Sequence, residues 1–136
     1  MQEGDRQIAD YIRCFRNGDR DAAFFGLLEM GHQIDPALMG IFRNERDRIV
    51  RALLVEVIWQ HRQASVIPFL GEAVQDAATE VWKQALDGLV SLASAESLAV
   101  MQSARDRRPS ESRESSEYCR RVDEAIEQAE SAIQST

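Results

Sequence analysis

The chain contains few of the residues that build reactive or metal-binding centres. Its two cysteines, Cys14 and Cys119, lie far apart and lack CxxC spacing, so we expect free, buried or half-buried thiols instead of a disulfide. Its two histidines, His32 and His61, show neither HExxH nor Cys-His ligand spacing, and each falls at a predicted helix end, where capping is the commoner role. The seven glycines form no phosphate-binding loop. We therefore expect no metal, no cofactor and no nucleophilic catalysis.

Long apolar runs and a surplus of basic residues are also missing. No stretch approaches 18 apolar residues, and the first residues are acidic, so the sequence predicts no membrane span, no export signal and a cytoplasmic location. The net charge of -7 disfavours nucleic acid as a partner, because phosphate neutralisation needs excess lysine and arginine. The short basic stretch at residues 43–51 could meet an anionic ligand, but arginines around a helix start more often form a solvated rim. Lys83 is the sole lysine, a usage that fits a GC-rich bacterial genome.

The 136 residues are enough for one packed domain, since 44% are hydrophobic and 29% are charged. A pattern within them repeats with a shift of about 31 residues: Val50-Arg51-x-x-Leu54-Val55-x-x-Ile58 returns as Val81-Trp82-x-x-Ala85-Leu86-x-x-Leu89. Each copy follows an apolar stretch that contains a proline, at residues 34–38 and 66–70. In the first stretch Asp35 and Pro36 suit a helix start, with an aspartate cap followed by proline in the first turn. A repeat of this length predicts stacked helical hairpins.

Apolar residues at helical spacing predict a series of helices, over residues 5–17, 35–44, 47–61, 66–74, 79–93 and 95–104. The second helix is predicted to be capped by Asp19 or Asp21 and to run through Met30, with Phe24 and Phe25 inward. The helix at residues 47–61 is apolar almost all round, which is typical of a central helix covered on several sides.

The last third of the sequence changes in composition. Residues 105–116 contain no aliphatic side chain and are rich in Arg, Ser and Glu around Pro109. We therefore expect a helical repeat domain at 1–106, a flexible linker at 107–116 and a C-terminal amphipathic helix at 117–136. The narrow apolar stripe of that helix would either cap the exposed end of the stack or pair with another chain.

The repeated segments, each preceded by an aspartate (Asp47, Asp76) and a proline-containing helix, resemble HEAT-like, armadillo-type repeats over about residues 34–93. This resemblance implies an all-α fold, a short right-handed α-α superhelix of hairpins. It also implies that an aspartate and an arginine tie neighbouring units together. Asp47 with Arg51 fits this role, whereas Trp82 replaces the arginine in the second copy. In such repeats the second helix of each unit lines the concave surface.

Equivalent positions on the two second helices carry acidic side chains, because Glu56 aligns with Asp87. On helices packed roughly 8 to 10 Å apart these carboxylates would form a row on one face; the alternative is that both are merely solvated residues on a helix flank. A tryptophan near that face suits a binding hot spot, although packing is the commoner role at a repeat junction. The predicted partner-binding residues are Leu53, Glu56, Trp59, Gln60, Trp82, Gln84 and Asp87.

These features favour a noncatalytic module that binds a protein more basic than itself, such as a bacterial immunity protein that neutralises a cognate toxin. A scaffold or assembly factor that associates through its terminal helix is the alternative. An enzyme would need Glu56 and Asp87 to act as an acid/base pair across a ligand-sized pocket. A resemblance in fold does not select among these functions.

Overall fold

The structure, a computed structural model, describes residues 3–107 and 113–135. These residues form eight α-helices and two short 3₁₀ helices, with no strand, which confirms the all-α prediction. In chain order the elements are α1 (Glu3–Arg16), α2 (Asp21–Glu29), η1 (His32–Ile34), α3 (Asp35–Asn44), α4 (Arg48–Gln60), η2 (Ala64–Val66), α5 (Ile67–Ala73), α6 (Thr79–Leu92), α7 (Ala95–Arg107) and α8 (Arg113–Gln134).

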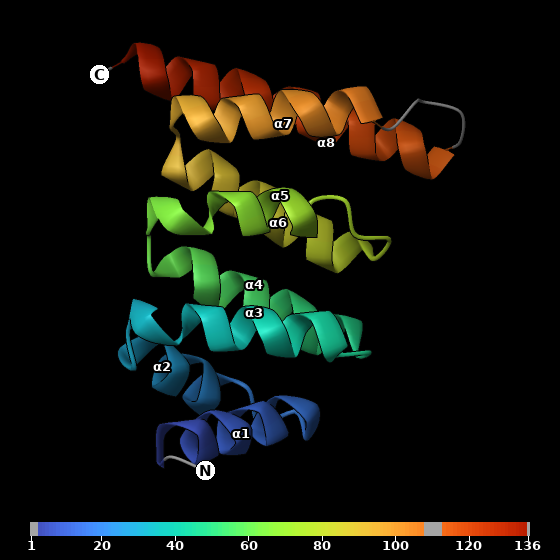
Figure 1. The fold of residues 1–136 in the computed structure, drawn as a ribbon. Helices are drawn as coiled ribbons and strands as arrows, with labels where there is room; N and C mark the ends of the chain where they lie inside the picture. Colours follow the sequence, from blue (N-terminus) through green and yellow to red (C-terminus); the bar gives the residue numbers. More distant parts are fainter. Residues whose placement is uncertain (1–2, 108–112, 136) are drawn as a thin grey trace.

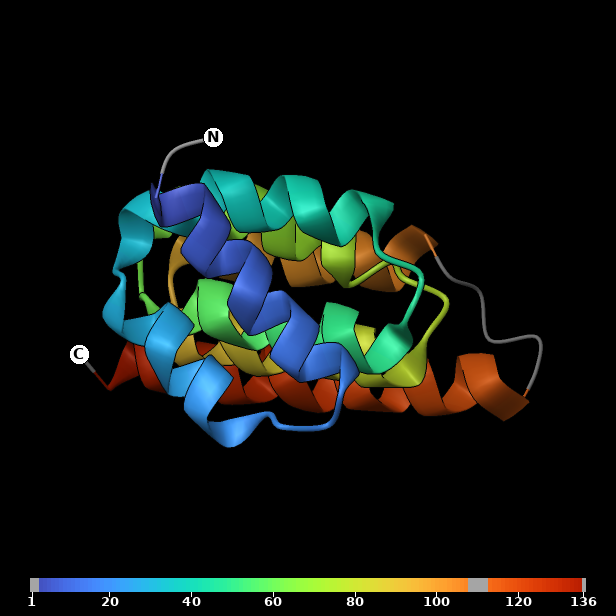
Figure 2. The ribbon, with the colours of Figure 1, turned by 90° about the horizontal axis from the view of Figure 1, so that it is seen from below.

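The helices pile up along one axis in chain order, from α1 at one end to α7 and α8 at the other (Figure 1). Viewed along that axis, α3, α5 and α7 form one layer, and α4, α6 and α8 form a second (Figure 2). Helix α2 packs against α4 and extends the second layer. The repeated segments become equivalent hairpins, because α3 and α5 each follow a 3₁₀ turn and carry a proline in the first turn.

Helix α4 lies at the centre of the stack, in contact with α1, α2, α3, α5 and α6. The Asp47 carboxylate caps its start by accepting hydrogen bonds from the backbone N–H groups of Ile49 (2.8 Å) and Val50 (3.2 Å). The predicted central helix is thus confirmed, and its fully buried side chains are Val50, Leu54, Val55, Val57 and Ile58.

Two predicted helix caps are wrong. Helix α2 has Arg20 at its N-cap position and no side-chain capping bond, so neither Asp19 nor Asp21 caps it. Asp35 is the first residue of α3 itself, and its carboxylate is buried against His61. The residue before Asp35 already has helical backbone angles, so α3 lacks the extended residue that an aspartate cap requires.

The predicted boundaries of the C-terminal segments also change. Helix α7 continues to Arg107 instead of ending near residue 104, and α8 begins at Arg113, four residues before the predicted start. Residues 113–116 of the predicted linker are therefore helical, and residues 108–112 lie outside the described residues. Polar residues suit the first turn of a helix, because a first turn need not bury an apolar face to form.

Helix α8 covers the end of the stack by packing on α6 and α7. Tyr118 is fully buried, its hydroxyl donates to the Val74 carbonyl at 2.9 Å, and its ring meets the Trp82 ring edge-on with centroids 4.9 Å apart. Val122 and Ala129 are fully buried as well. Of the two roles predicted for the apolar stripe of this helix, the structure shows capping.

Arg51 connects two repeat units as predicted, but its partner is not Asp47. Arg51 forms an ion pair with Asp76, which precedes the next second helix, and its Nη1 lies 3.2 Å from Asp76 Oδ1. The guanidinium also lies over the Phe42 ring, 4.7 Å from its centroid. Asp47 serves its own helix as a cap, so the pairing of Asp47 with Arg51 is wrong, although Arg51 does tie two units together.

Further ion pairs connect successive units at a constant sequence separation. Arg16 pairs with Glu45 and Arg43 pairs with Glu72, and the partners in both pairs are 29 residues apart. Arg43 and Glu72 are both exposed, and such a pair contributes at most about 1 kcal/mol, whereas the Glu45 side chain is only 7% exposed. The basic stretch predicted to be only a solvated rim instead contacts the next hairpin, through Arg43, Arg48 and Arg51.

No disulfide joins the two cysteines, and Cys14 is half-buried and Cys119 buried, as predicted. Among the described helices, none combines the length and apolar character that crossing a bilayer requires.

Candidate partner-binding face

The acidic pair predicted from the repeat lies on neighbouring helices of the second layer. Glu56 on α4 is half-buried, and Asp87 on α6 is exposed. Burial raises the pKa of the Glu56 carboxyl, the negative charge of Asp87 raises it further, and a long hydrogen bond from the Gln60 amide (3.5 Å) opposes both effects. The two carboxylates are thus close enough to repel each other, as expected for equivalent positions in stacked units.

Asp87 has a raised pKa because neighbouring protein atoms reduce its hydration, while the positive charge of Arg121 on α8 acts in the opposite direction. No ion pair neutralises Asp87 or Glu56 among the residues that the structure describes. A cation brought to this face from outside would therefore be attracted by two negative charges at once.

Trp59 and Gln84 join α4 and α6 beside the acidic pair. The Trp59 indole N–H donates to the Gln84 side-chain oxygen at 2.9 Å, and Arg62 lies over the indole, 5.9 Å from the ring centroid. Both Trp59 and Gln84 are half-buried. Gly88 of α6 sits under Trp59, where an added methyl group would come within 2.7 Å of the Trp59 Cβ, so the two helices approach closely at this point.

Trp82 belongs to the core instead of the surface. Its side chain is only 3% exposed, since Tyr118 of α8 covers it. The prediction that Trp82 contributes to a partner-binding surface is therefore not supported by its position, and packing, the commoner role at a repeat junction, is what the structure shows. The other six predicted residues, Leu53, Glu56, Trp59, Gln60, Gln84 and Asp87, retain exposed or half-buried side chains.

A cavity of about 180 Å³ extends this face toward α2. Leu53 and Glu56 line it from α4, and Phe24 and Phe25 line it from α2. Phe25 is 59% exposed, so the prediction that both phenylalanines point inward is wrong. Successive residues on an α-helix point about 100° apart, and a short helix with one buried face cannot bury both. That adjacency in the sequence could have shown that one of the two phenylalanines lies at the surface.

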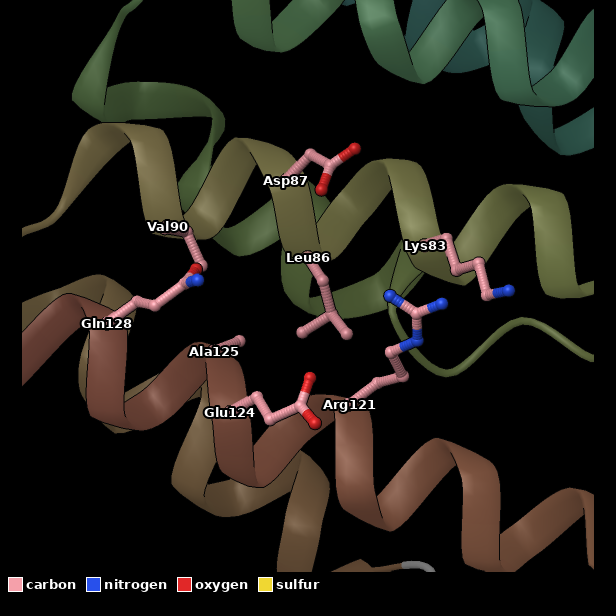
Figure 3. Close-up of a pocket in the computed structure, with 8 residues that line it drawn as sticks. All are labelled: Lys83, Leu86, Asp87, Val90, Arg121, Glu124, Ala125 and Gln128. Atoms are coloured by element: carbon pink, nitrogen blue, oxygen red, sulfur yellow. The ribbon is translucent and has the colours of Figure 1, made fainter.

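A second cavity, of about 280 Å³, lies between α6 and α8. Figure 3 shows Arg121 and Glu124 reaching from α8 toward α6, whereas the Asp87 carboxylate points away from α8. These residues of α8 were not predicted, because the sequence pattern does not reveal that α8 folds back along α6. The cavity is lined by Lys83, Leu86, Asp87, Val90, Arg121, Glu124, Ala125 and Gln128.

The two cavities separate the acidic pair: Glu56 lines the one beside α2, and Asp87 lines the one beside α8. Neither cavity offers both carboxylates to one small molecule, which is what an acid/base pair would need. Among the described residues, no group of three or more His, Cys, Asp or Glu side chains is placed to hold a metal ion.

No protein-family model, curated protein or solved structure matches the chain.

Proposed function

We propose that the chain is a noncatalytic protein-binding module, a short stack of HEAT-like hairpins that docks a more basic protein on one face of its second layer. This second-layer face consists of Leu53, Glu56, Trp59, Gln60, Gln84 and Asp87. The observation that carries the proposal is the pair formed by Glu56 and Asp87. Two carboxylates from successive repeat units lie close together with raised pKa values, and the described chain supplies no ion-pair partner to either.

An arginine or lysine of the partner would relieve the repulsion within this pair. A guanidinium suits the task because its planar fork donates two parallel hydrogen bonds to a carboxylate. Phe25, exposed at the edge of the same face, offers an aromatic contact next to the charges, and aromatic side chains are enriched among binding hot spots. A basic surface with an apolar neighbour is therefore the kind of partner that this face fits.

An immunity protein that neutralises a bacterial toxin is the specific role we propose. Small size, a net charge of -7 and a rigid stacked fold suit one-to-one capture of a basic enzyme, because opposite charge accelerates association. We also propose a cytoplasmic location, where the two cysteine thiols, which form no disulfide, would stay reduced.

The competing role of scaffold would use the apolar stripe of α8 for association. Its large side chains are already buried within this chain, Tyr118 and Val122 among them, which favours the binding module. Among the residues that the structure describes, no observation favours the scaffold role.

A charge-reversal experiment tests the proposal. Wild-type protein, the variant Glu56→Lys/Asp87→Lys and the control Glu96→Lys/Asp106→Lys are immobilised and used to capture proteins from the source organism. Glu96 and Asp106 are exposed residues of α7, in the other layer (Figure 2), and both double variants change the net charge equally. Circular dichroism confirms that all three proteins keep their helical content.

The expected result is a basic protein captured by the wild type and the control. Its dissociation constant for the Glu56→Lys/Asp87→Lys variant should rise at least tenfold at moderate salt, since like charges placed in an interface are strongly unfavourable. Equal capture by both double variants would reject this face as the docking surface.

A further inference from the structure

A buried aspartate–histidine pair connects the first hairpin to the rest of the stack. Asp35, the first residue of α3, is only 3% exposed, and His61 follows the last residue of α4. The His61 Nδ1 atom lies 2.7 Å from Asp35 Oδ1, and its Nε2 atom lies 3.0 Å from the Leu28 carbonyl oxygen of α2. One imidazole thus bridges α2, α3 and α4.

The geometry fixes the number of protons in this pair. A carbonyl oxygen only accepts hydrogen bonds, so His61 Nε2 must carry a hydrogen and donate it to Leu28. Nδ1 and the Asp35 carboxyl are 2.7 Å apart, and a contact this short needs one proton between them. Without it, two lone pairs would face each other in a buried site. The second carboxyl oxygen, Asp35 Oδ2, is buried without a hydrogen-bond partner in the structure, which further disfavours a bare carboxylate.

We propose that the contact between Asp35 and His61, which we call the junction, holds the α1–α2 hairpin against α3 and α4. The junction depends on pH because it forms only while the two side chains share a proton. When the proton is lost at higher pH, the junction breaks and the bridge to α2 weakens. Because α2 carries Phe25, the same event would loosen one side of the second-layer face.

Other charged groups lie near the junction, and an experiment must distinguish their effects on stability from the effect of the junction itself. His32 of η1 is exposed, and its charge acts on Asp35 to lower the pKa of that carboxyl, while burial, the larger effect, raises the same pKa. Glu29 follows Leu28 at the end of α2, and Arg62 follows His61 with its guanidinium over Trp59. His32 is the one imidazole among these three side chains, so a His32→Gln variant separates its contribution from that of the junction.

The sign of the effect follows from proton counting. In the unfolded chain a histidine releases its proton near pH 6.5 and an aspartic acid near pH 3.9. Between these values the unfolded pair holds the same number of protons as the folded pair, so stability does not change with pH through this junction. Above about pH 6.5 the folded pair retains a proton that the unfolded chain has lost. The folding equilibrium constant should then fall by up to about tenfold per pH unit.

Urea unfolding between pH 5.5 and 8.5 tests the proposal on the wild type, Asp35→Asn and His32→Gln. In Asp35→Asn the asparagine N–H can donate to Nδ1 of a neutral His61, so the folded protein no longer holds the extra proton. Its stability should therefore rise with pH up to about 6.5, where the unfolded histidine loses its proton, and stay level above. The wild type and His32→Gln should both lose stability above that pH.

A second measurement on the wild type covers the case in which Asp35→Asn does not fold. Nitrogen NMR of the His61 ring should show its proton still shared with Asp35 above about pH 6.5, where a histidine of the unfolded chain has become neutral. Amide exchange in α2, corrected for intrinsic rates, should then accelerate with pH relative to α6. Loss of the shared proton at about pH 6.5, as in an unfolded chain, or a wild-type stability that stays level above that pH, would overturn the proposal.

Discussion

Replacing Gly88 with alanine tests whether close contact between α4 and α6 holds the second layer together. A Cβ at position 88 would lie 2.7 Å from both Cβ and Cγ of Trp59 and 2.9 Å from its Cδ1. These atoms lie next to the α4 backbone and cannot swing away as the end of a flexible side chain could. The substitution must therefore push the two helices apart or distort Trp59 and its hydrogen bond to Gln84.

Two opposing effects set the magnitude. Overpacking of this kind costs about 1–3 kcal/mol, whereas alanine in place of glycine within a helix returns up to about 1 kcal/mol. We expect a net loss of about 1–2 kcal/mol, which corresponds to a fall of roughly 0.5 to 1 M in the urea midpoint for a protein of this size. Urea titration followed by circular dichroism measures it.

Gly40 of α3 provides the matched control, because an added methyl group there meets nothing within 4 Å. Gly40→Ala should stabilise the protein by about 0.5–1 kcal/mol through helix propensity alone. The two substitutions are thus expected to have opposite signs. If Gly88→Ala stabilises the protein as Gly40→Ala does, the two helices do not approach as described and the reasoning fails.

Two further predictions concern the charged residues of the stack. Arg51→Met should lower the free energy of unfolding by about 1–3 kcal/mol, because it leaves the largely buried Asp76 carboxylate without its cation. The control Arg13→Met, at an exposed pair, should change that free energy by less than about 0.5 kcal/mol. Equal effects of the two substitutions in urea titrations would contradict the role of Arg51 in connecting the two units. Glu56→Gln/Asp87→Asn should become progressively more stable than the wild type as pH rises from 4 to 7. The raised pKa values mean that the folded acids hold protons which the unfolded acids release near pH 4, and parallel stability profiles would show that these carboxylates are not destabilised by folding.

The candidate face was predictable where it depended on the repeat. The alignment of Glu56 with Asp87 follows from a 31-residue shift between equivalent helices, and the structure does place the two on adjacent helices of one layer. Position within a helix does not reveal which neighbour covers a side chain. Trp82 occupies an inward position that α8 closes, and Phe25 protrudes because no later helix packs over it.

The helices and their repetition are encoded locally, because helical periodicity, the Asp47 cap and the prolines act within a few residues along the chain. The contacts between polar groups become defined when the hairpins pack, since they depend on how far each hairpin rotates against the next. Arg51 pairs with Asp76, 25 residues later in the chain, instead of with Asp47. Asp35 contacts His61, 26 residues later, instead of capping α3. Local spacing carries no information about such distant pairs until the layers pack.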